Sequence, residues 1–173
     1  MGKSLLIVNT GDGKGKTTAA LGIVLRALGH GLPVCVIQFM KGTWQYGELF
    51  SVKRFQDLLE FHVMGNGFAR WEESLDTHKK AAQAAWALAK ESLETEKYRI
   101  VVLDELTYCV HYGFISEVEV AKVLSRRRKD LHVVVTGRDA PKTLIDAADL
   151  VTEMREIKHP FRNGIKGQKG IEF

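Results

Sequence analysis

Residues 5–20 read LLIVNTGDGKGKTTAA, and this stretch decides the fold class. Four apolar residues that favour a β-strand lead into a loop rich in glycine and lysine. A helix is predicted over residues 17–28 and is stopped by Gly29 and Gly31. A strand, a loop ending in Gly-Lys-Thr and a helix, in that order, predict a phosphate-binding loop.

Each residue type in this loop suits phosphate. Glycines let backbone N–H groups turn inward around phosphate oxygens, and the N-terminus of the helix adds a partial positive charge. Lys16 supplies a point charge, and the Thr17 hydroxyl can ligate Mg²⁺. The standard pattern has a glycine five residues before Gly15, where this chain has Thr10. We expect the nucleotide to contact Gly11, Asp12, Gly13, Lys14, Gly15, Lys16, Thr17 and Thr18.

Strand-like and helical segments alternate along the rest of the chain. Helices are expected at residues 74–93, 116–124 and 141–148, a loop at 41–48, and strands at 34–38, 61–64, 100–103, 133–136 and 150–154. Residues 100–103 are apolar at every position, as a strand covered on both faces requires. The pattern predicts an α/β fold of the RecA-like P-loop type, with a mostly parallel sheet and helices on both faces.

Length and composition fit one domain over residues 1–173. The chain is 45% hydrophobic and 27% charged, which argues against disorder. No apolar run approaches the ~20 residues of a membrane span, and no signal-peptide core stands apart from the fold. We therefore expect a cytoplasmic protein without a membrane partner.

The net charge and the spacing of cysteines and histidines narrow the possible ligands only slightly. The net charge of +4 is a mild excess, and a basic tail begins near residue 155. This tail is either solvated or suited to an acidic partner, and it is weak support for nucleic acid. Cys35 and Cys109 lie in or beside apolar stretches and are expected to be buried thiols. The histidine and cysteine spacings exclude the usual zinc sites.

A second acidic motif follows the expected strand at 100–103. Asp104 can hold Mg²⁺ directly or through water, and Glu105 lies where a catalytic or metal-associated carboxylate is often found. Four apolar residues and an acid are common in isolation. Together with the loop about ninety residues upstream, they predict a Mg-nucleotide site that includes Thr17, Asp104 and Glu105.

Three other segments follow expected strand ends, where parallel sheets bind ligands. Arg138 is either a surface arginine or a group that reaches a polyphosphate. Lys41 and Trp44 lie on a loop that suggests recognition of a second substrate. Phe68 and Trp71 lie on a glycine-flexed loop that is either a core plug or a lid over an apolar ligand.

These motifs together resemble the P-loop ATP:corrinoid adenosyltransferases of cobalamin biosynthesis. The resemblance covers nearly the whole chain and rests on GDGKGKTTAA at 11–20, VIQF at 36–39, KGTW at 41–44, GE at 47–48, VM at 63–64, GF at 67–68, LDELTY at 103–108, TGR at 136–138, AD at 148–149 and KH at 158–159. The shifted glycines of the loop look like this family's own version.

The resemblance implies transfer of the 5′-deoxyadenosyl group of ATP to a Co(I) corrinoid, with release of triphosphate. It implies catalytic roles for Lys16, Arg138 and Glu105, with Mg²⁺ beside the triphosphate. The corrinoid would contact Phe68, Trp71, Lys41 and Trp44. A homodimer and an electron donor such as reduced flavodoxin are also implied, with no nucleic acid partner.

Two departures from the family are visible. Relatives place the loop tryptophan two residues after the phenylalanine, whereas Trp71 is three after Phe68. Relatives often carry an N-terminal extension over the active site, and only a few residues precede the first strand expected here. We expect closure over the substrates to differ accordingly.

Two other classes of function share these motifs. A RecA-like NTPase motor acting on nucleic acid would hydrolyse ATP to ADP, but the chain is short and its basic excess small. A non-catalytic regulator would bind MgATP without turnover. The reaction product therefore separates the three readings: triphosphate, ADP or none.

Overall fold

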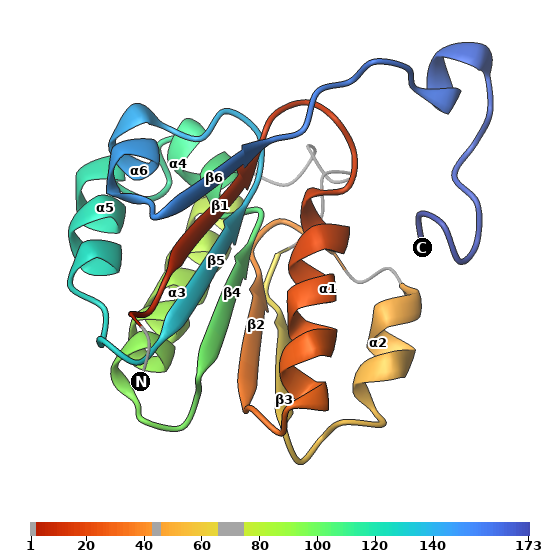
Figure 1. Ribbon diagram of the computed structural model, residues 1–173. Coiled ribbons are helices and arrows are strands. Elements are labelled where there is room, and N and C mark those ends of the chain that lie inside the picture. The colour runs from red at the N-terminus through yellow and green to blue at the C-terminus, as the bar shows by residue number, and fades with distance from the viewer. Residues whose placement is uncertain (1–2, 43–45, 66–74) are drawn as a thin grey trace.

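The computed structural model describes residues 3–42, 46–65 and 75–173. Within them, six strands form one sheet in the order β3-β2-β4-β5-β1-β6, and all neighbouring strands are parallel (Figure 1). The strands are β1 (Leu6–Thr10), β2 (Val34–Gln38), β3 (Leu59–Val63), β4 (Ile100–Asp104), β5 (His132–Thr136) and β6 (Leu150–Glu153). The prediction of an α/β fold with a parallel sheet is confirmed.

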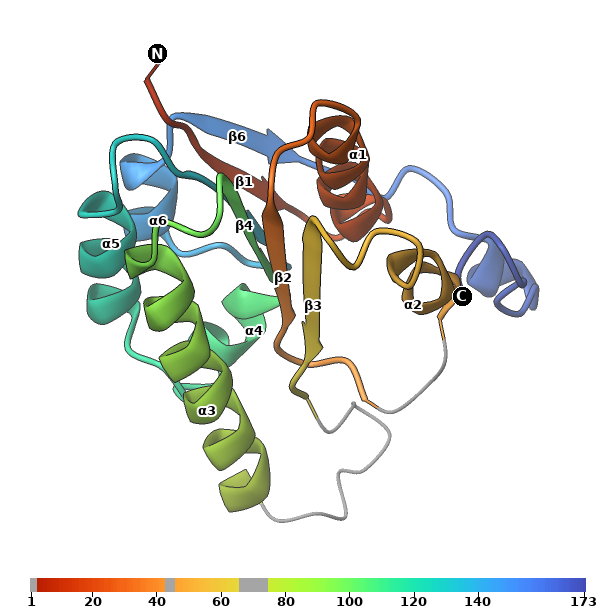
Figure 2. The same ribbon diagram turned by 90° about the horizontal axis from the view of Figure 1, so that it is seen from below.

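Helices cover both faces of this sheet (Figures 1 and 2). One face carries α1 (Lys16–Gly29) and α2 (Gly47–Val52). The other carries α3 (Leu75–Glu94), α4 (Leu106–His111), α5 (Glu117–Ser125) and α6 (Lys142–Ala147). A 3-10 helix, η2 (Pro160–Asn163), lies in the C-terminal segment, which runs out from the end of β6 (Figure 1).

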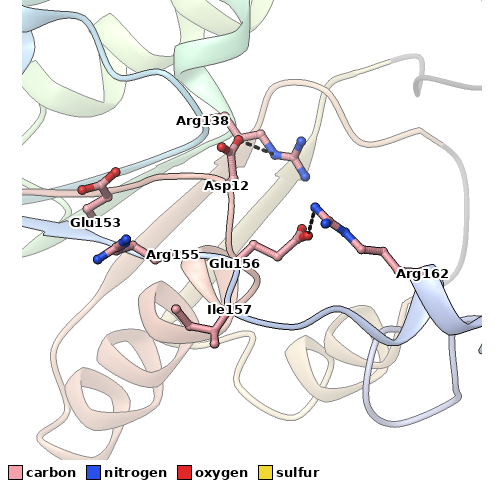
Figure 3. A pocket seen from close by; sticks show the side chains of 7 residues that line it. All are labelled: Asp12, Arg138, Glu153, Arg155, Glu156, Ile157 and Arg162. Atoms are coloured by element: carbon pink, nitrogen blue, oxygen red, sulfur yellow. Dashed lines mark ion pairs between the residues drawn. The ribbon is translucent and has the colours of Figure 1, made fainter.

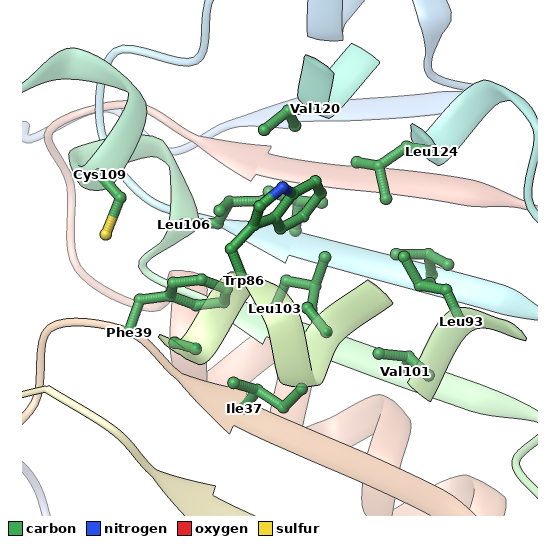
Figure 4. Close-up of a cluster of buried hydrophobic side chains, with 14 of the residues drawn as sticks. Ile37, Phe39, Trp86, Leu93, Val101, Leu103, Leu106, Cys109, Val120 and Leu124 are labelled. Carbon is green, nitrogen blue, oxygen red and sulfur yellow. The ribbon is translucent and has the colours of Figure 1, made fainter. Parts of the chain in front are cut away.

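The core consists of two apolar layers, one on each face of the sheet. In β4, Val101 and Leu103 pack toward α3, whereas Ile100 and Val102 pack toward α1. Trp86 of α3 lies at the centre of the first layer (Figure 4). Because both faces are covered, strands such as β4 must be apolar at every position. This explains the continuous apolar runs in the sequence.

The helix boundaries follow local signals where these are strong. Ser116 caps α5 and accepts a hydrogen bond from the backbone N–H of Glu119 at 3.4 Å, which fits the helix expected from residue 116. The expected loop over residues 41–48 was wrong at its end, because α2 begins at Gly47. Neither α2 nor α4 was predicted, whereas the equally short α6 was, because Pro141 marks its start.

The buried thiols were predicted correctly. Cys35 and Cys109 are free and fully buried, and burial raises the pKa of Cys35 to about 11 and that of Cys109 to about 12. No helix in the described part of the chain is long and apolar enough to span a membrane.

The strand order brings four polar strand ends together. The central strands β2, β4, β5 and β1 end in Gln38, Asp104, Thr136 and Thr10. Gln38 lies beside Asp104 in the register of β2 and β4, and Asn9 lies beside Thr136 in that of β1 and β5. A cluster of polar side chains thus forms at the carboxyl edge of the sheet, next to the loop between β1 and α1.

Candidate active site

The shifted glycines of the β1–α1 loop have a steric cause. A Cβ atom on Gly11 would lie 2.5 Å from the carbonyl oxygen of Met154, and one on Gly13 would lie 2.8 Å from the backbone of Arg155. Gly11 also has a positive φ of 93°. The chain leaving β6 therefore crosses directly over this loop, and Gly13 donates its N–H to the Met154 carbonyl at 2.7 Å. That N–H is thus directed at the C-terminal segment, and the contact of Gly13 with the nucleotide stays a prediction.

Lys16 lies in the middle of the loop at the start of α1. Its Nζ donates to the carbonyl oxygens of Gly11 at 2.5 Å and Gly13 at 2.6 Å. Gly15 precedes it with a φ of 109°, which allows the abrupt turn into the helix. Burial and the nearby charge of Arg138 lower the pKa of Lys16 below its usual value. An anion here would gain both this ammonium group and the N-terminal N–H groups of α1.

Asp104 is the centre of the polar cluster, with only 1% of its surface exposed. Its Oδ1 accepts hydrogen bonds from the hydroxyls of Thr17 at 2.8 Å and Thr136 at 2.7 Å. Its Oδ2 accepts from Nε2 of Gln38 at 2.9 Å. These three bonds compensate the burial of the carboxylate. They also join the loop helix to β2, β4 and β5.

Glu105 adopts an unusual backbone conformation, with φ 65° and ψ 22°. Its N–H donates to the hydroxyl of Thr136 at 2.9 Å. Burial, followed by the charge of Asp104, raises the pKa of Glu105 to about 7. Its Oε2 is buried without a hydrogen-bond partner among the described residues. A left-handed, non-glycine residue with an unsatisfied carboxylate oxygen is the kind of strain that accumulates at functional sites.

Lys41 lies beside the acidic residues of this cluster. Its Nζ is 3.3 Å from Glu48 and 3.7 Å from Asp104, and 5.0 Å from the centre of the Tyr46 ring. Burial opposes its charge, but the carboxylates of Asp104, Glu48 and Glu105 outweigh this and raise the pKa of Lys41. The structure thus brings Lys41 to the predicted metal residues, and its corrinoid contact stays a prediction.

Arg138 extends from the turn after β5 toward the loop. Its Nε lies 4.0 Å from Oδ1 of Asp12. Gly137 precedes it at φ 140°, where a Cβ atom would lie 2.0 Å from Oγ1 of Thr107. The Thr107 hydroxyl in turn donates to the Arg138 carbonyl at 2.5 Å, which fixes this turn. Arg138 and Asp12 line a cavity of about 390 Å³ with Glu153, Arg155, Glu156, Ile157 and Arg162 (Figure 3).

The nucleotide contacts of Lys14 and Thr18 also stay predictions. Lys14 forms an ion pair with Glu172 near the C-terminus, and Thr18 is exposed in the first turn of α1. Three predicted corrinoid-binding residues, Trp44, Phe68 and Trp71, lie outside the described residues. The two segments that lead to them begin side by side, because a Cβ on Gly65 would lie 2.5 Å from the backbone of Met40.

Sequence reasoning missed the supporting polar residues. Gln38 and Thr136 each end a strand directly after three buried apolar residues, as Asp104 does. That shared pattern was a usable signal. Glu48 was noted only within the GE pair at 47–48 and not as a site residue, because it reaches the cluster through the placement of α2 next to β3.

The donor set fits a magnesium ion shared with phosphate. No group of three or more His, Cys, Asp or Glu side chains suited to a metal occurs in the described ranges. Mg²⁺ is usually held by one or two carboxylates together with substrate phosphates and water. The unpartnered oxygen of Glu105 and the Thr17 hydroxyl, which gives its proton to Asp104, match that requirement.

Comparison with known proteins adds the family. A corrinoid adenosyltransferase from Sinorhizobium sp is 46% identical over 99% of this chain and 81% of its own length. One from Pseudomonas aeruginosa is 43% identical (99% and 84%), and corrinoid adenosyltransferase CobA from Salmonella typhimurium is 42% identical (99% and 86%).

A solved structure supports the fold alone. The flagellar accessory protein FlaH from Methanocaldococcus jannaschii superposes with a TM-score of 0.56 at 11% identity, over 87% of this chain and 70% of that one.

The family model of the ATP:corrinoid adenosyltransferases BtuR/CobO/CobP matches residues 2–173. With a P-loop, an acidic strand end and relatives that cover the whole sheet, the chain belongs to the ATP:corrinoid adenosyltransferase family of transferases.

Proposed function

We propose that this protein transfers the 5′-deoxyadenosyl group of ATP to the cobalt of a Co(I) corrinoid, in the formation or salvage of adenosylcobalamin. The electron pair of Co(I) forms the cobalt–carbon bond at C5′, the C5′–O bond breaks, and triphosphate leaves. The nucleophile belongs to the substrate, so the protein needs no activated side chain. Its contribution is to position the two substrates and to stabilise the leaving group.

The position of Lys16 is the observation that carries this proposal. Its ammonium group lies inside the loop, held by two backbone carbonyls at 2.5 and 2.6 Å. Triphosphate oxygens would replace these carbonyl contacts, and the growing charge on the leaving group would strengthen the new ones. Arg138, whose side chain is about half exposed at the same edge of the sheet, would add a second positive charge.

We assign the magnesium contacts to Thr17 and Glu105. Asp104 would orient the Thr17 hydroxyl through Oδ1, which also accepts from Thr136, and its Oδ2, which accepts a hydrogen bond from Gln38, would hold a water of the ion. When bound, Mg²⁺ supplies neutralising charge to the triphosphate. Glu105 would provide a carboxylate oxygen that has no other partner among the described residues.

The corrinoid would lie over the adjoining ends of β2 and β3, where the segments toward Trp44, Phe68 and Trp71 begin. An apolar wedge such as Phe68 would exclude the lower axial ligand of cobalt and so make reduction to Co(I) easier. Reduced flavodoxin or a similar protein would supply the electrons, and the active protein would be a homodimer. The modest net charge of +4 supports the view that nucleic acid is not a partner.

The test is to incubate the protein with MgATP and chemically reduced cob(I)alamin. Formation of a cobalt–carbon bond is followed in the visible spectrum, and the released phosphate compound is identified. Equal amounts of alkylated cobalamin and triphosphate are expected. Release of ADP, stimulated by DNA or RNA, would instead indicate a motor, and nucleotide binding without any product would indicate a regulator.

A further inference from the structure

The hydroxyl of Thr136 contacts both acidic residues of the candidate site. Thr136 ends β5 and is completely buried. Its Oγ1 donates to Oδ1 of Asp104 at 2.7 Å and accepts the backbone N–H of Glu105 at 2.9 Å. One hydroxyl therefore uses its single proton on one acidic residue and a lone pair on the next.

The two bonds have different consequences. The bond to Asp104 supplies one of the two hydrogen bonds to Oδ1, and the other comes from Thr17. The second bond satisfies the backbone N–H of Glu105, whose φ is 65°, at the point where the chain turns from β4 into α4. The hydroxyl thus sets the direction of the Asp104 carboxylate and stabilises the turn that places Glu105.

Filling the space at position 136 would not by itself require a hydroxyl. The preceding positions of β5 are Val133, Val134 and Val135, all completely buried. Valine has nearly the shape of threonine and would fill position 136 without the cost of burying a polar group. A buried hydroxyl that follows three buried valines is stabilised only by its hydrogen-bond partners, and here both partners are predicted nucleotide-site residues.

We propose that Thr136 is a positioning residue for the reaction: its hydroxyl holds Asp104 and Glu105 in the arrangement that binds Mg-ATP. This inference rests on the proposed function. It concerns how Asp104 and Glu105 are held in place, and it assigns Thr136 no contact with the substrates. The same logic ranks Gln38 second, because it touches Asp104 alone.

The experiment compares Thr136→Val, which keeps the shape, with Thr136→Ser, which keeps the hydroxyl. Val135→Ala is the matched control, because this residue is completely buried one position earlier and packs in the layer with α3. ATP binding is measured by calorimetry over a series of Mg²⁺ concentrations. Adenosylation of cob(I)alamin is measured over the same series, and melting temperature is recorded for each variant.

Thr136→Val is expected to raise the half-saturating Mg²⁺ concentration about tenfold in both assays, because a hydrogen bond to a charged group is lost. Thr136→Ser is expected to stay within about twofold of the wild type. Val135→Ala is expected to lower the melting temperature by several degrees with no change in the Mg²⁺ requirement.

An unchanged Mg²⁺ requirement in folded Thr136→Val overturns the inference, as does a Val135→Ala shift equal to that of Thr136→Val. If Thr136→Val does not fold, Thr136→Cys takes its place, because a thiol is a weak donor and must shift the requirement in the same direction. Failure of the wild type to form the cobalt–carbon bond would refute the proposed function. Wild-type transfer with an unaltered Thr136→Val titration refutes only the role of Thr136.

Discussion

Replacing Asp104 with asparagine is expected to separate its contribution to folding from its contribution to the metal site. The asparagine carbonyl can still accept the hydroxyls of Thr17 and Thr136, which both lie on Oδ1. The new NH₂ group would face Nε2 of Gln38, 2.9 Å from the present carboxylate. Gln38 can relieve this by turning its amide, because its Oε1 has no hydrogen-bond partner among the described residues.

The stability change follows from these contacts. Three hydrogen bonds lose about 1 kcal/mol each when the acceptor becomes neutral. Against this loss, the asparagine variant no longer carries the free-energy cost of burying the Asp104 charge, which is only 1% exposed. We therefore expect the free energy of unfolding to fall by only about 1–2 kcal/mol, a small value for a completely enclosed position.

The effect on the metal is expected to be much larger. Residues that support a metal ligand typically change metal affinity or activity by about 10–100-fold. Asp104→Asn should therefore raise the half-saturating Mg²⁺ concentration by about that factor, as measured by ATP binding and by adenosyl transfer. Denaturant unfolding gives the stability in the same preparation.

The double variant Gln38→Glu with Asp104→Asn is the control, because it restores the charge at the neighbouring strand end. It is expected to be as stable as Asp104→Asn but to keep the high Mg²⁺ requirement, since the carboxylate no longer touches Thr17. A wild-type Mg²⁺ requirement in Asp104→Asn would refute this reasoning. So would a stability loss above about 4 kcal/mol that by itself explains the lost activity.

Three further predictions use other parts of the structure. Lys16→Ala should reduce adenosyl transfer about 100-fold at saturating ATP, or ~3 kcal/mol, with an unaltered melting temperature; near-normal turnover would remove Lys16 from the site. Gly13→Ala should lower the melting temperature, because its Cβ would meet the backbone that follows β6. Gly22→Ala, on open helix surface, should raise the free energy of unfolding by roughly 0.5–1 kcal/mol; equal effects of the two changes on stability would contradict the close crossing. The hydrogen bond from Lys3, and then the other donors, lowers the pKa of Asp149 to about 2. Its contribution to stability is therefore present above the unfolded-state pKa of about 4 and lost as the pH falls through about 2. Thermal melts should accordingly show Asp149→Asn less stable than wild type at pH 7, with the difference closing between about pH 4 and pH 2; a gap that persists at pH 2 would contradict this.

The sequence by itself determined the fold class and the chemical centre of the site. Continuous apolar strands such as β4 can be stable only between two layers of helices, so the parallel sheet could be predicted from the order of apolar runs and helical segments. The glycine-rich loop and the acidic strand end were equally readable, because each carries its chemistry within a few consecutive residues. Short helices such as α2 and α4 were not, because they form where tertiary contacts favour them and not where a pattern demands them.

The tertiary structure alone decided which residues surround the acidic pair. The order β2-β4-β5-β1 places Gln38, Asp104 and Thr136 on adjacent strand ends, although 66 residues separate the first two and 32 the last two. Only the sheet order makes such distant residues neighbours. The glycines at 11 and 13 have the same kind of cause: a side chain at either position would collide with residues 154–155, which cross the loop and come from the far end of the chain.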